Sequence, residues 1–313
     1  MSLLVLNLFL WVGESWWPVS LLLFLPRWVF LGPLIALLPL VAWSRDRWSA
    51  ALFALGALVT LGPIMEWNWP RWTTSPSTRE QTVDRLRVLT FNEENDHFAG
   101  QSLVDLLERE GIDLVCLQEW YPDPIVESYF RRGWHLDPSG CVASRHPIER
   151  SLDLDVVRQG DPNLVRVLVR LPSGRLVQMA SVHGESMRFG IEHLARGDVT
   201  GLETVIARRA SRLRRIRRAV DENRDLPTLI AGDFNTPSPS PLLRAFRPHF
   251  REAFQEAGRG FGYTWPSVFP GLRIDQVLVG PEWRVTRCWV GEALGSDHCP
   301  MIAEVELPAL PGR

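Results

Sequence analysis

Polar side chains stand at the ends of several apolar runs in this 313-residue chain. The runs VLTF, VCLQ, MASV and LIAG each lead into an amide, a carboxylate or an imidazole, and the motifs RID and SDH add three more such groups. In chain order these residues are Asn92, Glu119, His183, Asp233, Asn235, Asp275, Asp297 and His298. Each alone is explained as a turn former or a hydrogen-bonded core residue. Together they predict one site, because strand ends in a layered α/β protein can converge on one rim.

The chemistry that this set could perform is metal-assisted hydrolysis of a phosphoester. Carboxylate and amide oxygens are typical ligands of hard cations such as Mg²⁺ or Mn²⁺. A cation at the rim would neutralise phosphate oxygens and stabilise a leaving oxyanion. An Asp–His pair would supply a base for the attacking water, with the tautomer of the imidazole held by the carboxylate.

Short β-branched runs alternate with amphipathic stretches from residue 86 onward. The amphipathic spacing predicts helices over 102–110, which Gly111 closes, and over 199–222. A turn at 172–174 predicts a hairpin between two strands. The predicted strands cover 86–91, 113–119, 165–171, 175–183, 227–232, 274–280 and 301–307. This order predicts an α/β fold in which helices pack outside mixed sheets.

The charge pattern does not indicate a broad nucleic-acid surface. All 34 basic residues are arginine, and with 36 acidic residues they leave a formal net charge of −2. Seven arginines crowd into RRASRLRRIRR at 208–218. This run is either a patch for phosphate or anionic lipid or a solvated helix face, and we expect the solvated face because the apolar spacing leaves that side outside. The cysteines lack metal-ligand spacing and are expected to be packing residues: Cys116, Cys141, Cys288 and Cys299.

The first 69 residues have the composition of a membrane segment. They hold only six charged residues, and tryptophans cluster at the edges of their apolar runs. Residues 28–43 and 49–66 approach the length of about 20 residues that a helix needs to cross a bilayer. The run 3–12 is either a third span that extends toward Leu25 or an interfacial segment. We therefore predict an integral membrane anchor of two or three transmembrane helices.

The orientation of this anchor follows from its flanking charges. Arg45 and Arg47 indicate a cytoplasmic loop, which places the following domain on the extracytoplasmic side, whereas Arg71 and Arg79 favour the opposite orientation. A buried helical hairpin of a soluble protein and a cleavable signal peptide are the alternatives, and the length of the apolar block disfavours both. The expected divisions are an anchor at 1–69, a linker at 70–84, a catalytic domain at 85–308 and a tail at 309–313.

The ordered series FN, QE, SVH, GDFNTP, RID and SDHCP resembles the endonuclease/exonuclease/phosphatase superfamily, the DNase I-like fold. The resemblance covers about residues 85–308 and is specific as a series, because GDFN, ID and SDH-x-P follow one another at the spacings that the family uses. It implies a four-layer α/β sandwich of two sheets flanked by helices, with a divalent-metal site at one end of the sheets. The apolar first segment resembles that of membrane-anchored bacterial members.

The resemblance also implies which residues would surround a metal ion. Glu119 would be the principal ligand of Mg²⁺ or Mn²⁺, with Asn92 and Asp297 close to the metal. Glu94 stands where some members carry a further acid.

Roles at the phosphate and the attacking water are implied in the same way. Asp233 and Asn235 would orient the water and bind the scissile phosphate. His298, held by Asp275, would act as general base or stabilise the phosphate. His183 would contact the phosphate or assist the leaving group.

Two departures from the family pattern bear on the substrate. Gln276 stands where many members carry a tyrosine after ID, and Pro266 stands where abasic-site nucleases tend to have an aromatic residue. Both departures disfavour a function in DNA repair. We expect a phospholipid or lipid-linked phosphoester in preference to extracellular nucleic acid, with a catalytically silent, membrane-tethered binding module as the alternative. A Ser-His-Asp hydrolase is set aside because the chain lacks G-x-S-x-G.

Overall fold

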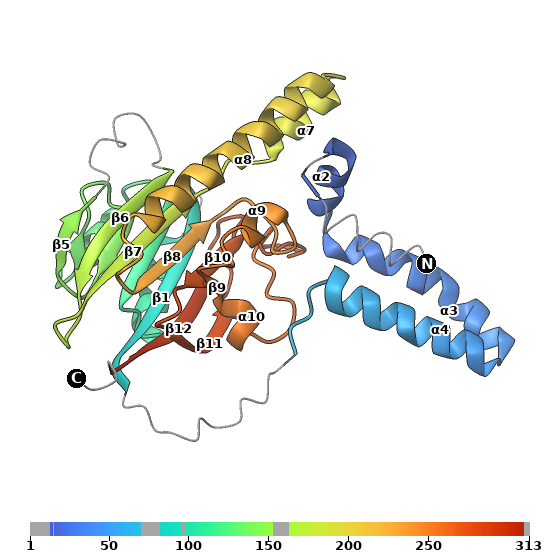
Figure 1. Cartoon of the computed structure of the whole chain (residues 1–313), viewed down its shortest axis with the longest axis horizontal. Helices are drawn as coiled ribbons and strands as arrows, with labels where there is room; N and C mark the ends of the chain where they lie inside the picture. Colours follow the sequence, from blue (N-terminus) through green and yellow to red (C-terminus); the bar gives the residue numbers. More distant parts are fainter. Residues whose placement is uncertain (1–12, 15, 70–81, 96–97, 153–162, 310–313) are drawn as a thin grey trace.

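Two six-stranded mixed sheets pack face to face at the centre of the protein (Figure 1). The computed structural model describes residues 13–14, 16–69, 82–95, 98–152 and 163–309. Helices cover the outer face of each sheet. The predicted four-layer α/β sandwich is therefore confirmed.

The first sheet and its helices comprise β1 (Thr82–Asn95), α5 (Gly100–Arg109), β2 (Leu114–Trp120), α6 (Pro124–Phe130), β3 (His135–Leu136), β4 (Val142–Ser144), β11 (Arg284–Val290) and β12 (Met301–Pro308). The strand order is β11-β12-β1-β2-β4-β3. β1 and β2 run parallel, and α5 forms the crossover that parallel neighbours require. Gly111, with a φ of 59°, ends this helix in the left-handed conformation that a glycine adopts without steric cost.

The second sheet and its helices comprise β5 (Ile148–Ser151), β6 (Leu164–Arg170), β7 (Leu176–His183), α7 (Arg188–Ala195), α8 (Val199–Asp221), β8 (Thr228–Asp233), α9 (Pro241–Arg244), β9 (Arg251–Glu252), α10 (Ala253–Ala257) and β10 (Asp275–Val279). The strand order is β5-β6-β7-β8-β10-β9. β6 and β7 form the predicted hairpin, and β7 and β8 run parallel with α7 and α8 in the crossover. Each predicted strand and both predicted helices are present.

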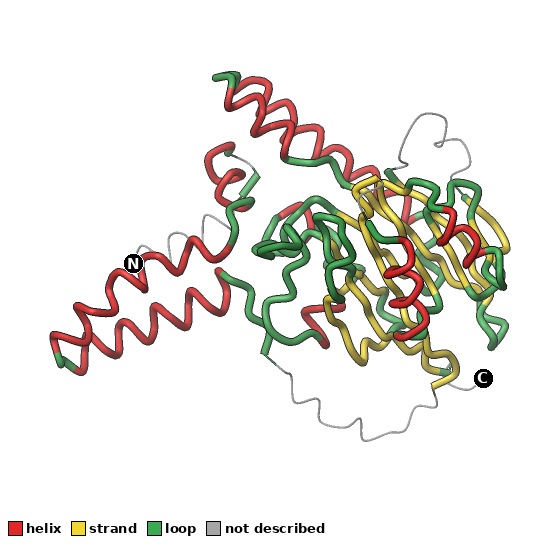
Figure 2. Tube along the Cα trace, turned by 180° about the vertical axis from the view of Figure 1, so that it is seen from behind, coloured by secondary structure: helices red, strands yellow, loops and turns green. Residues whose placement is uncertain are grey.

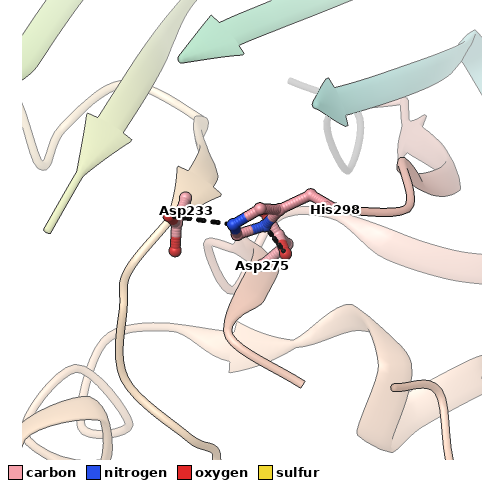
Figure 3. A group of neighbouring side chains, drawn as sticks. All are labelled: Asp233, Asp275 and His298. Atoms are coloured by element: carbon pink, nitrogen blue, oxygen red, sulfur yellow. Dashed lines mark hydrogen bonds and ion pairs between the residues drawn. The ribbon is translucent and has the colours of Figure 1, made fainter. Parts of the chain in front are cut away.

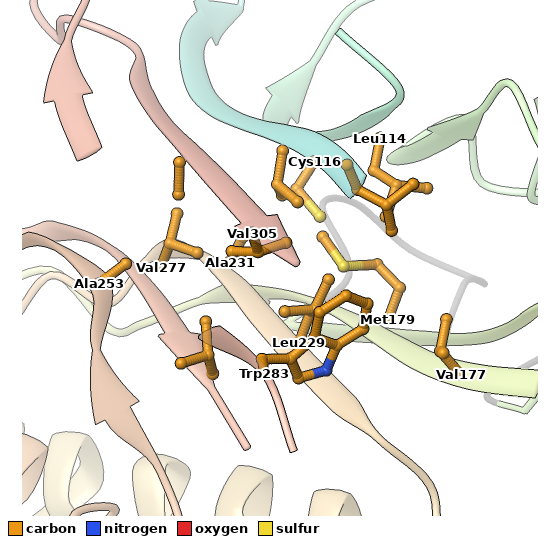
Figure 4. Close-up of a cluster of buried hydrophobic side chains, with 14 of the residues drawn as sticks. Leu114, Cys116, Val177, Met179, Leu229, Ala231, Ala253, Val277, Trp283 and Val305 are labelled. Carbon is orange, nitrogen blue, oxygen red and sulfur yellow. The ribbon is translucent and has the colours of Figure 1, made fainter. Parts of the chain in front are cut away.

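Apolar side chains from both sheets meet between them (Figure 4). Cys116 of β2, Met179 of β7, Leu229 of β8 and Val305 of β12 are fully buried there. They alternate with residues that point to the outer faces, because the side-chain period of a strand is two. Full burial of each large apolar side chain contributes about 1.5–3 kcal/mol. All four cysteines are buried free thiols, which confirms their packing role.

The outer face of the second sheet packs against α8, through residues such as Leu213 and Ile216. The prediction that the arginines at 208–218 occupy a solvated face is wrong for Arg209, which is buried. Arg209 follows Ile206 by three residues and precedes Leu213 by four, so it belongs to the apolar stripe of the helix. Its guanidinium is stabilised there by Glu14, at 3.1 Å, and by a hydrogen bond to Thr236.

Two apolar helices project from the sandwich as an antiparallel pair (Figure 2). The N-terminal elements are α2 (Trp17–Leu23), the 3₁₀ turn η1 (Arg27–Leu31), α3 (Gly32–Ser44), α4 (Arg47–Val59) and the π turn η2 (Thr60–Ile64). Together they give two 18-residue segments, Arg27–Ser44 and Arg47–Ile64, whose length and composition suffice to cross a membrane. Their side chains are largely exposed, as for Trp43 (84 %) and Leu52 (70 %).

The expected third apolar run and the expected linker are only partly covered by the described residues. Residues 1–12, which include the expected run 3–12, lie outside the described residues. A single span from that run to Leu25 is not formed, because residues 13 and 14 are not helical and α2 has only seven residues. Most of the expected linker also lies outside the described residues, and its last three residues, 82–84, belong to β1.

Charged residues of the N-terminal segment form buried ion pairs with the sandwich. Glu66 accepts from Arg27 at 3.3 Å and from Arg273 at 3.0 Å, and all three side chains are buried. Glu14 pairs with Arg209 at 3.1 Å. The helix pair is therefore docked on the domain by charges that are shielded from water.

Replacement of Glu66 tests this docking. Glu66→Gln leaves two buried guanidinium groups without their carboxylate, which is expected to cost about 3–5 kcal/mol. We expect the midpoint of thermal unfolding of the detergent-solubilised protein to fall by on the order of 10 °C. The control is Glu292→Gln, which removes an exposed ion pair with Arg109 and should cost no more than about 1 kcal/mol. Equal midpoints for the two variants would contradict the docking role.

Candidate active site

Backbone ladders of the second sheet place three predicted site residues in one row. In the parallel ladder between β7 and β8, His183 lies opposite Asp233. In the antiparallel ladder between β8 and β10, Asp275 lies opposite the same Asp233. The row follows one end of the sheet, because β7 and β8 end at these residues and β10 begins there. The strand ends therefore converge as the sequence predicts.

Gly232 allows β7 and β8 to approach each other just before Asp233. A Cβ at Gly232 would lie 1.9 Å from the carbonyl oxygen of Val182. The buried Asp233 carboxylate accepts the Asn235 backbone N–H at 2.6 Å and the Asn235 side-chain amide at 2.8 Å. Asn235 adopts a left-handed φ of 47°, which asparagine tolerates better than most residues. The GDFN segment is thus a turn and part of the site at once.

The first sheet brings Asn92 and Glu119 to the same place. The amide of Asn92 donates to Oε1 of Glu119 and to Oδ2 of Asp233, at 3.1 Å in both cases. Its oxygen accepts the backbone N–H of Glu94 at 3.0 Å. Asn92 therefore links carboxylates from the two sheets. Glu94 and Glu119 have φ values of 51° and 52°, and such strain in non-glycine residues is typical of functional sites.

Ser296 fixes the loop that carries His298. Its hydroxyl donates to the carbonyl oxygen of Asn92 at 2.7 Å and accepts the backbone N–H of His298 at 3.0 Å. The loop before β12 is thereby held against the end of β1. The signal for this residue was present in the sequence, because a serine two residues before a functional residue commonly forms such a turn.

Asp297 is positioned by two contacts that the motif pattern did not reveal. Its Oδ2 accepts the indole N–H of Trp265 at 2.9 Å, and its backbone N–H donates to Glu94 at 3.0 Å. Trp265 comes from the loop before β10, so its proximity to Asp297 is a consequence of the tertiary fold. Glu94, expected only as a further acid, also lines the cavity described below.

His298 lies between two buried carboxylates (Figure 3). Its Nδ1 is 2.9 Å from Oδ2 of Asp275, and its Nε2 is 3.8 Å from Oδ2 of Asp233. Burial disfavours the charged imidazolium, but the carboxylates of Asp275 and Asp233 outweigh this effect and raise the pKa of His298 to about 10. The raised pKa favours the imidazolium form of His298, in which Nδ1–H donates to Asp275.

The neighbouring groups are shifted by the same environment. Burial raises the pKa of Asp233 to about 7, although the positive charge of His298 acts against this shift. Burial, together with the positive charges of His298 and Arg212, lowers the pKa of His183 to about 3. His183 is thus neutral, with its Nε2 3.6 Å from Glu119 and 3.9 Å from Asp233.

A cavity of about 440 Å³ lies beside these side chains. Its acidic and polar lining includes Glu94, Glu119, Asp233, Asn235, Asp297 and His298. Oδ1 of Asp275 is buried and has no hydrogen-bond partner among the described residues. Carboxylate oxygens of Asp233 and Asp275 also lie within 4.8 Å of each other. A donor set so rich in carboxylate oxygen fits a hard divalent cation.

Five of the eight predicted site residues line this cavity. The other three do not line the cavity but contact residues that do: Asn92 and His183 contact Glu119, and Asp275 contacts His298. Gln276, the departure noted after ID, is buried and donates to the Ser238 hydroxyl at 3.2 Å, so it supports the loop that follows Asn235.

Comparisons with known proteins agree with this arrangement. A family model described as "Endonuclease/Exonuclease/phosphatase family" matches residues 89–298. A comparison with curated protein sequences gives no match. Among solved structures, an endonuclease/exonuclease/phosphatase family protein from Bacteroides thetaiotaomicron is similar, with a TM-score of 0.53, 13 % identity and coverage of 72 % of this chain and 99 % of that chain.

Two further solved structures share the architecture. An AP endonuclease from Archaeoglobus fulgidus has a TM-score of 0.52 and 17 % identity, with 70 % of this chain and 98 % of that chain covered. A mannosyl-6-phosphatase from Bacteroides thetaiotaomicron VPI-5482 has a TM-score of 0.51 and 14 % identity, with 70 % and 99 % covered. At these identities the similarity establishes a common fold.

The charge state of His298 can be measured directly. In Asp275→Asn the imidazolium loses its nearest carboxylate, so the pKa of His298 should fall from about 10 toward the usual histidine value of about 6.5. NMR of protein with isotope-labelled histidine would follow the titration. Because the folded-state pKa is raised, the linked stability is present below about pH 6.5 and is lost as the pH rises through about 10.

The control for this titration is Asp198→Asn, at an exposed Asp–His pair with His193. That variant should leave the His298 signal unchanged. If His298 has the same pKa in the wild type and in Asp275→Asn, then Asp275 does not raise the pKa of His298.

Proposed function

The chain belongs to the endonuclease/exonuclease/phosphatase family, and on this premise we propose that it is a membrane-anchored phosphoester hydrolase that requires a divalent cation. The observation that carries the proposal is the imidazole of His298 between two buried carboxylates, beside a cavity with further carboxylates. A phosphate group in that cavity would meet a fixed positive charge, while the acids around it supply ligands for a cation.

The proposed cation is Mg²⁺ or Mn²⁺. Glu119 would be its principal ligand, Asp297 and Asn92 would lie close to it, and Glu94 is a further candidate because it lines the same cavity. When bound, the ion would neutralise phosphate oxygens and stabilise the leaving oxyanion. The carboxylate-rich donor set supports this choice over a softer metal.

We assign activation of the water to Asp233. The family resemblance instead implies His298, held by Asp275, as the general base or as a group that stabilises the phosphate. A pKa of about 7 allows Asp233 to accept a proton near neutral pH, and general bases work best under that condition. His298 would instead hold its proton and stabilise the charge that develops on the phosphate. Asn235 would help to orient the water, and neutral His183 would contact the phosphate or assist the leaving group.

The proposed membrane topology follows from the shape of the helix pair. The tip between α3 and α4 carries Arg45 and Arg47 and lies at the end remote from the sandwich (Figure 1). A cytoplasmic tip would place the sandwich on the extracytoplasmic side, by the bias of basic residues toward cytoplasmic loops.

Nucleic acid is the less favoured substrate. The arginine run of α8 was the feature that supported it, and much of that run is engaged within the protein. Arg208 and Arg212 both pair with Glu185, at 3.3 and 2.7 Å, and Arg217 pairs with Asp221 at 3.6 Å. These pairs reduce the positive charge that a phosphate backbone would encounter.

Substitution of the two central groups tests the enzyme proposal. Asp233→Asn and His298→Gln should each lower kcat/KM for para-nitrophenyl phosphoesters, measured with Mg²⁺ or Mn²⁺, by at least about 10²-fold. Asp198→Asn, at an exposed residue that does not line the cavity, should retain wild-type activity, and circular dichroism would verify that each variant is folded. Wild-type rates in both site variants would overturn the assignment.

Metal-dependent stabilisation separates an enzyme from a silent module. At a metal concentration of about 100 times Kd, bound cation should stabilise the wild type by about 2.7 kcal/mol. Glu119→Gln should lose most of this gain. Glu149→Gln, at an exposed ion pair with Arg170, should keep it. A calorimetric or fluorescence melting series would decide, and equal stabilisation of all three proteins would argue against Glu119 as a ligand.

A further inference from the structure

The cavity beside His298 has an apolar wall as well as a charged one. The apolar residues that line it include Phe24, Met187, Ile191, Leu272 and Ile274. A phosphate and a metal ion account for the charged wall but give no reason for an apolar one. The two walls together match an amphiphilic ligand, since a binding cavity places apolar surface against the apolar part of its ligand.

Phe24 enters this wall from the N-terminal segment, directly after α2. That helix packs on α7 and α8, where Trp17, Leu21 and Phe24 surround the buried Met187 and Leu202. The guanidinium carbon of Arg209 lies 4.7 Å from the centre of the Phe24 ring, and Arg209 is itself paired with Glu14. The segment that leads into the two apolar helices is therefore part of the cavity, and it is held there by a buried charge pair.

Apolar side chains are exposed both at the cavity and beside the start of those helices. Ile191 lines the cavity and is nevertheless 48 % exposed, so the cavity reaches the surface at α7. Val268 and Phe269 are exposed in the loop before β10, and Phe269 lies 5.9 Å from the ring of Trp28 in η1, where the first apolar helix begins. The loop that carries Phe269 therefore contacts the start of the first apolar helix.

We propose that the cavity takes a phosphoester that carries a long apolar chain and that reaches the site from the bilayer in which α3 and α4 are embedded. The phosphate lies at His298 and Asp233, and the first part of the chain lies against Phe24, Ile191 and Leu272. This inference rests on the proposed hydrolase function and specifies its substrate class. It gives the anchor a second role, because the anchor supplies one wall of the binding site.

Inhibition by alkyl phosphates of increasing length tests the apolar wall. The full-length protein in nanodiscs hydrolyses a para-nitrophenyl phosphoester in the presence of methyl, butyl or octyl phosphate. Each methylene that is buried should tighten inhibition by up to about fourfold. Equal inhibition by the three compounds would overturn the inference while leaving the hydrolase function intact. A wild-type protein with no activity on any para-nitrophenyl phosphoester would instead remove the proposed function and this inference with it.

Variants at Ile191 locate the effect. Ile191→Ser should reduce the preference for octyl over methyl phosphate by about tenfold, and Ile191→Leu should restore it. The matched control is Leu136→Ser, because Leu136 is similarly exposed (43 %) but lies on the edge strand β3. A preference that is unchanged in Ile191→Ser, or that falls equally in Leu136→Ser, would contradict the assigned wall.

A last arm tests supply from the bilayer. Octadecyl phosphate incorporated into the nanodiscs should inhibit hydrolysis of the soluble substrate, whereas nanodiscs without it should not. The contrary outcome is that octyl phosphate inhibits from solution while octadecyl phosphate in the nanodisc does not. In that case a ligand in the bilayer does not reach the apolar wall of the cavity, and that part of the inference is wrong.

Discussion

The position of Asp233 between His183 and Asp275 is the constraint on which the site depends. It is set by backbone ladders on both sides of β8, parallel to β7 and antiparallel to β10. A slip of one residue in either ladder would turn the side chain to the other face of the sheet. Gly232 makes the required close approach of the strands feasible. The remaining contacts of the site, including the link through Asn92 to the first sheet, follow from this row.

Electrostatics then gives similar side chains different roles. His298 is buried and His183 is half-buried near the same carboxylate, yet the pKa of His183 is lowered and that of His298 is raised. The difference arises because Asp275 bonds the imidazole of His298 at 2.9 Å, whereas Nε2 of His183 lies 3.6 Å from Oε1 of Glu119 and 3.9 Å from Oδ2 of Asp233. Once His298 is charged, its field further disfavours protonation of His183. One aspartate thus determines which imidazole carries the proton.

The same use of buried charge joins the apolar helices to the sandwich. Glu14 and Glu66 each pair with an arginine of the sandwich, and neither pair is exposed to solvent. Buried pairs of this kind contribute little net stability relative to apolar contacts, but they are costly to break and so favour one arrangement. The consequence is that Phe24 is held in the wall of the cavity. The apolar helix pair and the cavity wall are then joined in one packed unit.

Much of this protein was accessible from local sequence alone. Strand and helix periods, the turn residues after each apolar run and the length of the apolar block are local properties. They predicted mixed sheets with outer helices, eight residues around one site and two apolar helices, whereas the four-layer sandwich was implied by the family resemblance. Tertiary structure alone decided which atoms meet. Spacing places Arg209 on the apolar stripe of its helix, but its partner Glu14 is 195 residues away, so spacing could not identify the carboxylate that stabilises the buried guanidinium. Phe24 and Trp265 likewise enter the site from distant segments, because packing between elements, and not spacing along the chain, determines which side chains share a cavity.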